Sequence, residues 1–255
     1  LNDKELDANI INHQINNDHL EKGYLTWLTR PEMQKQKGNY DYYMYLEHDI
    51  KFTERNLQYY LRYQKSLSEN KFNLGFLIYE KNNEDNENYS IHISEKLNKF
   101  FNLNSQNFII NDLENYCCFW IYDQNQFNDF INSKWWNFKK KVHNFRHNYG
   151  ITERSSIGFN ALNINYFKAT LLPEINSKLD PNCFIEHITN NYYYKYPEFR
   201  GKNFKDIRGA CSLKIDEITD VNKYKNETII SLYFKRLFNI ILWKFRFITR
   251  LFQKK

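Results

Sequence analysis

Apolar side chains recur along this chain at two spacings, one of which predicts strands and the other helices. Residues 40–50 are dense in β-forming side chains and end in acidic ones, which indicates a buried strand with carboxylates at its C-terminal end. Residues 53–69 have the helical spacing instead. The apolar positions on one face of this predicted helix are Leu57, Tyr60, Leu61 and Leu67.

Strand-like and helix-like segments alternate through the rest of the chain. Further strands are predicted at residues 73–80, 89–93, 107–110, 116–122 and at the start of 183–191. Helices are predicted over much of residues 1–40, over 123–133 with Asp123 near the start, and at the beginning of 150–165. Alternation of this kind is typical of an α/β domain. We expect a mixed sheet flanked by helices over residues 1–225.

The last segment, residues 226–255, has a different pattern. Its polar positions cluster in one arc of a helical wheel, and the wide remainder is apolar and rich in Phe. From Lys235 onward it holds seven basic residues and no acidic one. This pattern predicts an amphipathic helix on an anionic membrane surface. The alternative is a C-terminal helix docked on the core.

Composition and charge narrow the class of protein. The chain has 42% hydrophobic and 26% charged residues, as soluble globular proteins do, and a net charge of +6. Its basic residues are spread along the chain except at the end, so we do not expect a nucleic-acid partner. Residues 1–15 are polar, and no apolar run reaches the ~18–20 residues that cross a bilayer, so neither a signal peptide nor a membrane span is expected.

The four cysteines have no metal-ligand spacing. Cys117 and Cys118 are adjacent, and no C-x-x-C occurs. We interpret all four as free thiols of a reducing compartment, so the expected location is cytoplasmic and peripheral on the membrane.

The acidic end of the strand at residues 40–50 is the strongest candidate for chemistry. Glu47 and Asp49 lie two apart, so a regular strand directs both to one face and His48 to the other. Carboxylates at the C-terminal end of a strand lie where α/β sheets bind ligands. Hard oxygen ligands suit Mg²⁺ or Mn²⁺, which such sites hold with one or two carboxylates and substrate phosphates.

Several segments, in this order, resemble a group of glycosyltransferases with a GT-A-like fold. They are Trp27-Leu28-Thr29-Arg30-Pro31, residues 40–50 with Tyr45-Leu46-Glu47-His48-Asp49-Ile50, residues 75–80, residues 120–127, Thr152-Glu153-Arg154 and residues 187–192. The resemblance covers residues 20–205. It implies transfer of a sugar from a nucleotide sugar, such as a UDP-sugar, to a glycan or lipid-linked acceptor.

The resemblance also implies roles for single residues. Asp49 and Glu47 would bind Mn²⁺ or Mg²⁺, with His187 as a distant third ligand. Arg30, Glu47, Asn190 and Asn191 would contact the donor, although the two asparagines suit a turn equally well. Glu153 would be the catalytic base of an inverting transferase, and Glu186 is the second choice. Asp123 could contact the acceptor, while the aromatic residues beside it are better explained as core.

Two departures from the family pattern limit what the resemblance implies. His48 stands where the family has an acidic residue. Only 46 residues precede Glu47, so the nucleotide-binding part is short or missing. Two other functions therefore remain open: a metal-dependent nuclease or phosphotransferase built on Glu47, Asp49 and His187, and a sugar-binding subunit without catalysis.

Overall fold

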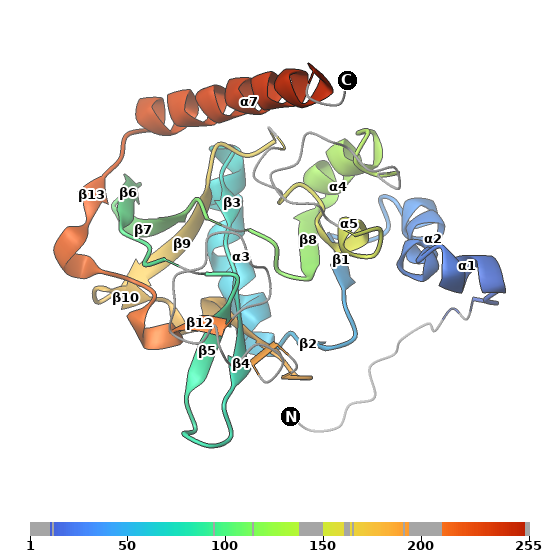
Figure 1. The fold of residues 1–255 in the computed structure, drawn as a ribbon, viewed down its shortest axis with the longest axis horizontal. Coiled ribbons are helices and arrows are strands. Elements are labelled where there is room, and N and C mark those ends of the chain that lie inside the picture. Colours follow the sequence, from blue (N-terminus) through green and yellow to red (C-terminus); the bar gives the residue numbers. More distant parts are fainter. Residues whose placement is uncertain are drawn as a thin grey trace.

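The computed structural model describes residues 11, 13–93, 95–113, 115–137, 150–160, 164, 166–190, 192–193 and 211–252. In this part of the chain the protein is of the mixed α/β class, with sheets flanked by helices (Figure 1). The predicted class is confirmed. The described strands are divided among three sheets, however, whereas the sequence led us to expect one.

The N-terminal region is helical in short pieces. It contains α1 (Asn17–Glu21), a 3₁₀ turn (Leu25–Trp27) and α2 (Thr29–Lys35). α2 starts directly after Leu28, and Pro31 lies in its first turn, where the missing N–H of proline removes no helical hydrogen bond.

The predicted strand at residues 40–50 is two strands separated by a turn. β1 (Tyr42–Leu46) pairs antiparallel with β8 (Phe119–Asp123) in a sheet of two strands. β2 (Ile50–Lys51) joins a different sheet. Residues 47–49 therefore connect two sheets.

The sheet that contains β2 has five strands and brings distant segments together. Its order is β12 (Cys211–Lys214), β5 (Asn88–Ile91), β4 (Leu77–Lys81), β11 (Phe184–His187) and β2. β11 runs parallel to β4, with Glu186 opposite Tyr79, and antiparallel to β2, with His187 opposite Ile50. His187 consequently lies beside both Glu80 and the end of the 47–49 turn.

The third sheet has six strands and includes neither of the strands that flank the 47–49 turn. It contains β10 (Lys178–Leu179), β9 (Thr170–Ile175), β7 (Gln106–Asn111), β6 (Lys99–Leu103) and β13 (Lys225–Asn226), and β3 (Asn73–Leu74) pairs with β9. The predicted strand at residues 73–80 is thus split between two sheets, at Gly75 and Phe76.

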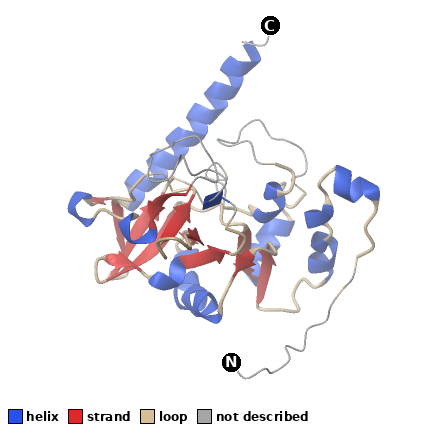
Figure 2. Ribbon diagram, turned by 60° about the horizontal axis from the view of Figure 1, so that its bottom comes forward, coloured by secondary structure: helices blue, strands red, loops and turns tan. Residues whose placement is uncertain are grey.

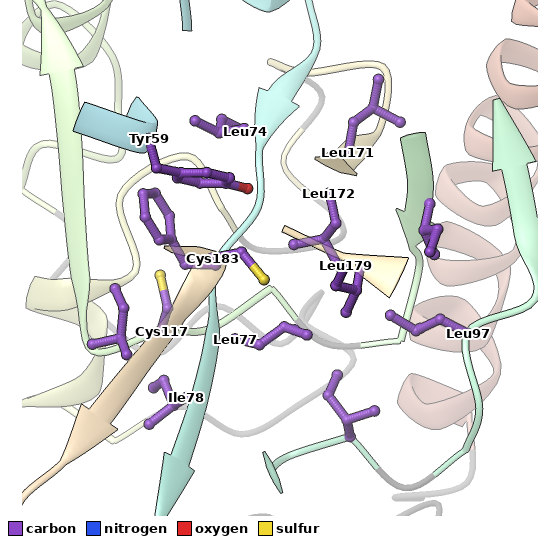
Figure 3. Close-up of a cluster of buried hydrophobic side chains, with 14 of the residues drawn as sticks. Tyr59, Leu74, Leu77, Ile78, Leu97, Cys117, Leu171, Leu172, Leu179 and Cys183 are labelled. Carbon is purple, nitrogen blue, oxygen red and sulfur yellow. The ribbon is translucent and has the colours of Figure 1, made fainter. Parts of the chain in front are cut away.

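Helix α3 (Glu54–Glu69) lies against both larger sheets. It begins with a capping box, in which Thr53 and Asn56 each accept a hydrogen bond from the other's backbone N–H. Tyr59, not Leu61, faces the core, where its hydroxyl donates to the Gly75 carbonyl at 2.8 Å. Figure 3 shows Tyr59 among the buried apolar side chains from β3, β4 and β9.

A second, mainly aromatic core lies between β1, β8, α2 and α4 (Gln124–Ile131). Asp123 caps α4 by accepting the Gln126 backbone N–H at 2.8 Å, and it lies at the start of the helix, as the sequence predicted. Trp120 and Tyr122 are buried here, so the interpretation of these aromatic residues as core is confirmed.

The C-terminal segment forms α7 (Ile229–Phe252), after 3₁₀ turns at Ile215–Glu217 and Val221–Lys223. In Figure 2 the far end of α7 stands clear of the sheets. A stripe of apolar side chains on this helix is exposed by 49–68%: Ile230, Phe234, Phe238, Ile241 and Phe245. In the part of the chain that the structure describes, no helix is long and apolar enough to cross a membrane.

Candidate functional site

The turn between β1 and β2 holds the two predicted carboxylates. The Glu47 backbone N–H donates to the Cys118 carbonyl at 3.2 Å, and the Glu47 carbonyl accepts the Ile50 N–H at 3.2 Å. Glu47 and Asp49 are half-buried, and His48 is exposed. Glu47 and Asp49 thus differ in exposure from His48, which agrees with the prediction that His48 points away from them. A turn rather than a strand produces this difference.

Three side chains from the five-stranded sheet and this turn form a continuous chain of contacts. His187 lies between two carboxylates, with Nε2 at 3.1 Å from Asp49 Oδ2 and Nδ1 at 2.6 Å from Glu80 Oε1. Glu80 is fully buried, and His187 is 3% exposed. The neighbouring backbone adds a further bond, from the Ile188 N–H to the Asp49 carbonyl at 2.9 Å.

The two carboxylates determine the charge of His187. Burial by itself would lower the pKa of the imidazole, but the hydrogen bonds and negative charges of Glu80 and Asp49 outweigh it and raise the pKa above its usual value. In the metal-free protein, a proton on Nε2 therefore favours the contact with Asp49.

Glu47 belongs to a second group of hydrogen bonds beside this chain of contacts. The Tyr116 hydroxyl donates to Glu47 Oε1 at 3.1 Å and lies 3.1 Å from the Ser156 hydroxyl. Burial raises the pKa of Glu47; hydrogen bonds from Ser156 and Tyr116 oppose this rise, and the charges of Asp49 and Glu153 add to it. Glu47 thus takes up a proton more readily than an exposed carboxylate does.

Glu153 lies in the same region, at the start of the short helix α5 (Glu153–Ser156). Its carboxylate accepts the backbone N–H of Gly150. Its charge contributes to raising the pKa of Glu47 and of Tyr116, although burial is the main cause in both. The structure therefore brings Glu153 near Glu47, about a hundred residues away in the sequence.

Aromatic rings border these carboxylates. The Tyr192 ring lies 5.3 Å from the His187 ring and 6.3 Å from the His92 ring, and His92 lies 5.8 Å from Tyr116. Burial, followed by the nearby Cys118 and the carboxylates Glu153, Glu47 and Glu80, raises the pKa of Tyr192 to about 12. Tyr192 therefore stays neutral and can offer a ring face and a hydroxyl to a ligand.

Arg30 does not reach this region, which corrects the prediction that it contacts the donor. It is 2% exposed, and its two terminal nitrogens donate at 2.8 Å to the carbonyls of Trp136 and Ser155. The guanidinium also lies over the rings of Trp27 and Trp136, at 4.5 and 4.7 Å. Both terminal nitrogens and the charge of Arg30 thus make contacts inside the aromatic core.

The remaining predicted residues have structural contacts. Asn190 accepts the backbone N–H of Lys81 at 3.0 Å, which is the turn-building alternative for this residue. Glu186 forms ion pairs with Lys81 and Lys51 at 2.7 and 3.2 Å, and despite partial burial these contacts lower its pKa. Glu186 is therefore a poor proton acceptor. Asn191 lies outside the described residues.

The donor atoms at Asp49 and His187 fit a hard divalent cation. Asp49 Oδ1 is buried and has no hydrogen-bond partner, and Oδ2 lies 3.1 Å from an imidazole nitrogen. Two ligands at right angles on an octahedral ion, each at ~2.1 Å, are ~3 Å apart. Among the residues that the structure describes, no three side chains of His, Cys, Asp or Glu are placed to hold a metal ion by themselves. Glu47, which is bonded to Tyr116, is therefore not a third ligand in this arrangement.

Sequence reasoning did not assign a role to several residues around Asp49. They are Glu80, His92, Tyr116 and Tyr192. Only Glu80 had a signal of its own, since it is a carboxylate at the end of an apolar run that predicts a buried strand. Comparison of the chain with models of protein families, with curated proteins and with solved structures gives no match.

Proposed function

We propose that this chain is a metal-dependent glycosyltransferase, which moves a sugar from a nucleotide-sugar donor to a glycan or lipid-linked acceptor. The observation that carries the proposal is the contact of Asp49 with His187, residues 138 apart in the sequence. The family resemblance of the sequence makes both residues candidate metal ligands. Glu47 and Glu153, the other two candidates for the chemistry, lie beside this pair.

Mn²⁺ or Mg²⁺ would be held by Asp49 and His187, with the donor diphosphate as the source of further oxygen ligands. The cation would supply Lewis-acid stabilisation of the departing diphosphate. Burial of His187 and of Asp49 Oδ1 keeps water from these two metal-binding groups. Close contacts hold the Asp49 and His187 side chains in position before the nucleotide sugar binds.

The carboxylates beside the pair are suited to the proton transfer. Glu153 is the proposed base, which takes the proton of the acceptor hydroxyl onto a carboxylate oxygen as that hydroxyl attacks the sugar. Glu47, which accepts hydrogen bonds from Tyr116 and Ser156, lies close enough to Glu153 for the charges of the two carboxylates to interact.

The apolar stripe of α7 supports a membrane location for this activity. Five exposed large side chains on one helix face are costly in water and suit the boundary between lipid headgroups and acyl chains. The basic residues of the segment complement anionic lipids. A lipid-linked acceptor would be presented at the same surface.

A calorimetric titration with UDP, with and without Mn²⁺, tests the proposal. We expect UDP binding that requires Mn²⁺ and that Asp49→Ala reduces by at least tenfold, since it removes one of two ligands. Asp112→Asn is the matched control, because this exposed carboxylate pairs with Lys99 on the six-stranded sheet.

The alternatives give different results in the same experiment. Absence of nucleotide binding by the wild-type protein would rule out the transferase and favour a sugar-binding subunit. Mn²⁺-dependent hydrolysis of a simple phosphodiester, without UDP binding, would favour a nuclease or phosphotransferase.

A further inference from the structure

The buried carboxylate of Glu80 makes contacts that its position in β4 alone does not require. Glu80 is fully buried and accepts hydrogen bonds from the backbone N–H groups of Tyr192, at 3.1 Å, and Tyr193. Its Oε1 also lies 2.6 Å from His187 Nδ1. One side chain therefore contacts the candidate metal ligand and the backbone that carries the Tyr192 ring.

The strand register places these groups side by side. β4 and β11 are parallel, and Tyr79 lies opposite Glu186, so the next residues, Glu80 and His187, are also neighbours. Adjacent residues in neighbouring strands point to the same face of the sheet. Glu186 points to the opposite face, where it pairs with Lys51 and Lys81.

A buried carboxylate is costly unless several donors surround it. Three N–H groups can meet this requirement here: two from the backbone and one from the imidazole. An ionised carboxylate only accepts hydrogen bonds, so the contact with Nδ1 requires a proton on that nitrogen. Nε2 is then the nitrogen left to face Asp49. A proton on Nε2 can bond to Asp49 in the metal-free protein, and without that proton Nε2 is the nitrogen that can bind a cation.

We infer that Glu80 is a positioning residue: it fixes the His187 ring with Nδ1 protonated and Nε2 directed toward Asp49, and it holds the 192–193 backbone against the same ring. The inference rests on the proposed metal role of His187. It assigns Glu80 no contact with substrate. Carboxylates that orient a metal-binding histidine in this way change metal affinity when they are removed.

The test compares Glu80→Gln with Asp180→Asn. Asp180 is also fully buried and also accepts a backbone N–H, from Asn182 at 3.0 Å, but it contacts Tyr63 rather than His187. Glutamine has one acceptor oxygen in place of two, so it can keep only one of the two backbone contacts, and its amide nitrogen donates instead of accepting. It therefore no longer dictates which ring nitrogen carries the proton.

Two readouts separate positioning from stability. The imidazole ¹⁵N chemical shifts, recorded without metal at a pH where His187 is neutral, should show protonated Nδ1 in the wild type and in Asp180→Asn. Glu80→Gln should show the other tautomer or a mixture. The Mn²⁺ dissociation constant should rise about 10–100-fold in Glu80→Gln and stay unchanged in Asp180→Asn.

Other results would overturn the inference. Glu80→Gln with wild-type ¹⁵N shifts and wild-type Mn²⁺ affinity would leave Glu80 a purely structural group. If Glu80→Gln does not fold, the wild-type protein alone decides: ¹⁵N chemical shifts that place the proton of the neutral ring on Nε2 would also overturn the inference. If the wild type fails to bind Mn²⁺, the proposed function fails, while the ¹⁵N comparison still decides whether Glu80 sets the tautomer.

Discussion

At the scale of single residues, the candidate site gathers several carboxylates around one imidazole. Asp49, Glu80 and His187 share one chain of contacts, and Glu47 and Glu153 lie beside it. Two lysines of the same sheet, Lys51 and Lys81, are paired with Glu186 on the other face. The imidazole therefore lies among negative charges, and a cation bound by Asp49 and Nε2 would replace the proton on that nitrogen.

The contacts of His187 with two carboxylates make the stability of the metal-free protein depend on pH. Burial opposes the charge on His187, but Glu80 and Asp49 raise its pKa above the usual 6.5. A pKa raised by folding stabilises the fold fully below the unfolded value, and this stability is lost as the pH rises through the folded value. We expect the difference in unfolding free energy between wild type and His187→Asn, measured in urea with EDTA, to be largest below pH 6.5 and to shrink above it. A difference that grows as the pH rises would contradict this assignment.

Some residues of the candidate site could be predicted from the sequence, and others could not. Asp49 and His187 were predicted as partners, and the structure brings them together. Arg30 was assigned to the donor because its segment resembles the family pattern, but the sequence does not show that its guanidinium meets two backbone carbonyls in an aromatic core. Tertiary contacts at that distance along the chain leave no local pattern.

At the scale of elements, the contact between α5 and β8 supports the position of Glu153. Gly158, which follows α5, has a φ of +52°, and a Cβ there would overlap the Tyr122 hydroxyl and press on Trp120. That hydroxyl also contacts the Phe159 backbone N–H, at 2.6 Å. We expect Gly158→Ala to lower the unfolding free energy through both the left-handed backbone and the overlap.

Gly38→Ala separates these two causes. Gly38 has a φ of +86°, but a Cβ there would meet nothing within 4 Å, so only the backbone cost of ~1–2 kcal/mol applies. Overpacking should make Gly158→Ala more destabilising than Gly38→Ala by about 1–3 kcal/mol in chemical denaturation. Equal losses would show that the loop after α5 moves freely, and would weaken the case that it holds Glu153 in place.

Elements with a strong local pattern were predicted well, and those stabilised by distant contacts were not. α3 and α4 begin at capping residues, Thr53 and Asp123, which the sequence displays. β6, β9 and β10 were missed, because their residues gain strand structure from pairing with other strands of the six-stranded sheet. The buried face of α3 was partly wrong, because Tyr59 finds a hydrogen bond in the core and Leu61 remains exposed.

At the scale of the whole molecule, the exposed stripe of α7 gives a test of the membrane proposal. We expect the protein to co-sediment with vesicles that contain phosphatidylglycerol, and less with pure phosphatidylcholine, because anionic lipids attract the basic segment. The double variant Phe234→Ser and Phe238→Ser should reduce the bound fraction several-fold.

Leu20→Ser is the matched control for this experiment. Leu20 is 60% exposed, like Phe238, but it lies at the other end of the chain, in α1. Equal vesicle binding by the wild type and the double variant would remove α7 as the membrane contact. A loss of binding in Leu20→Ser as well would point to a general effect of surface hydrophobicity.

The parallel pairing of β4 with β11 also has a consequence for synthesis on the ribosome. Glu80 and His187 are 107 residues apart, so β4 leaves the ribosome well before its partner strand exists. At ~5–20 residues per second, this interval lasts on the order of ten seconds. During that time one edge of β4 has no β11 to pair with and can associate with another nascent chain. We therefore expect the yield of folded protein to depend on translation speed and on chaperones that cover strand edges.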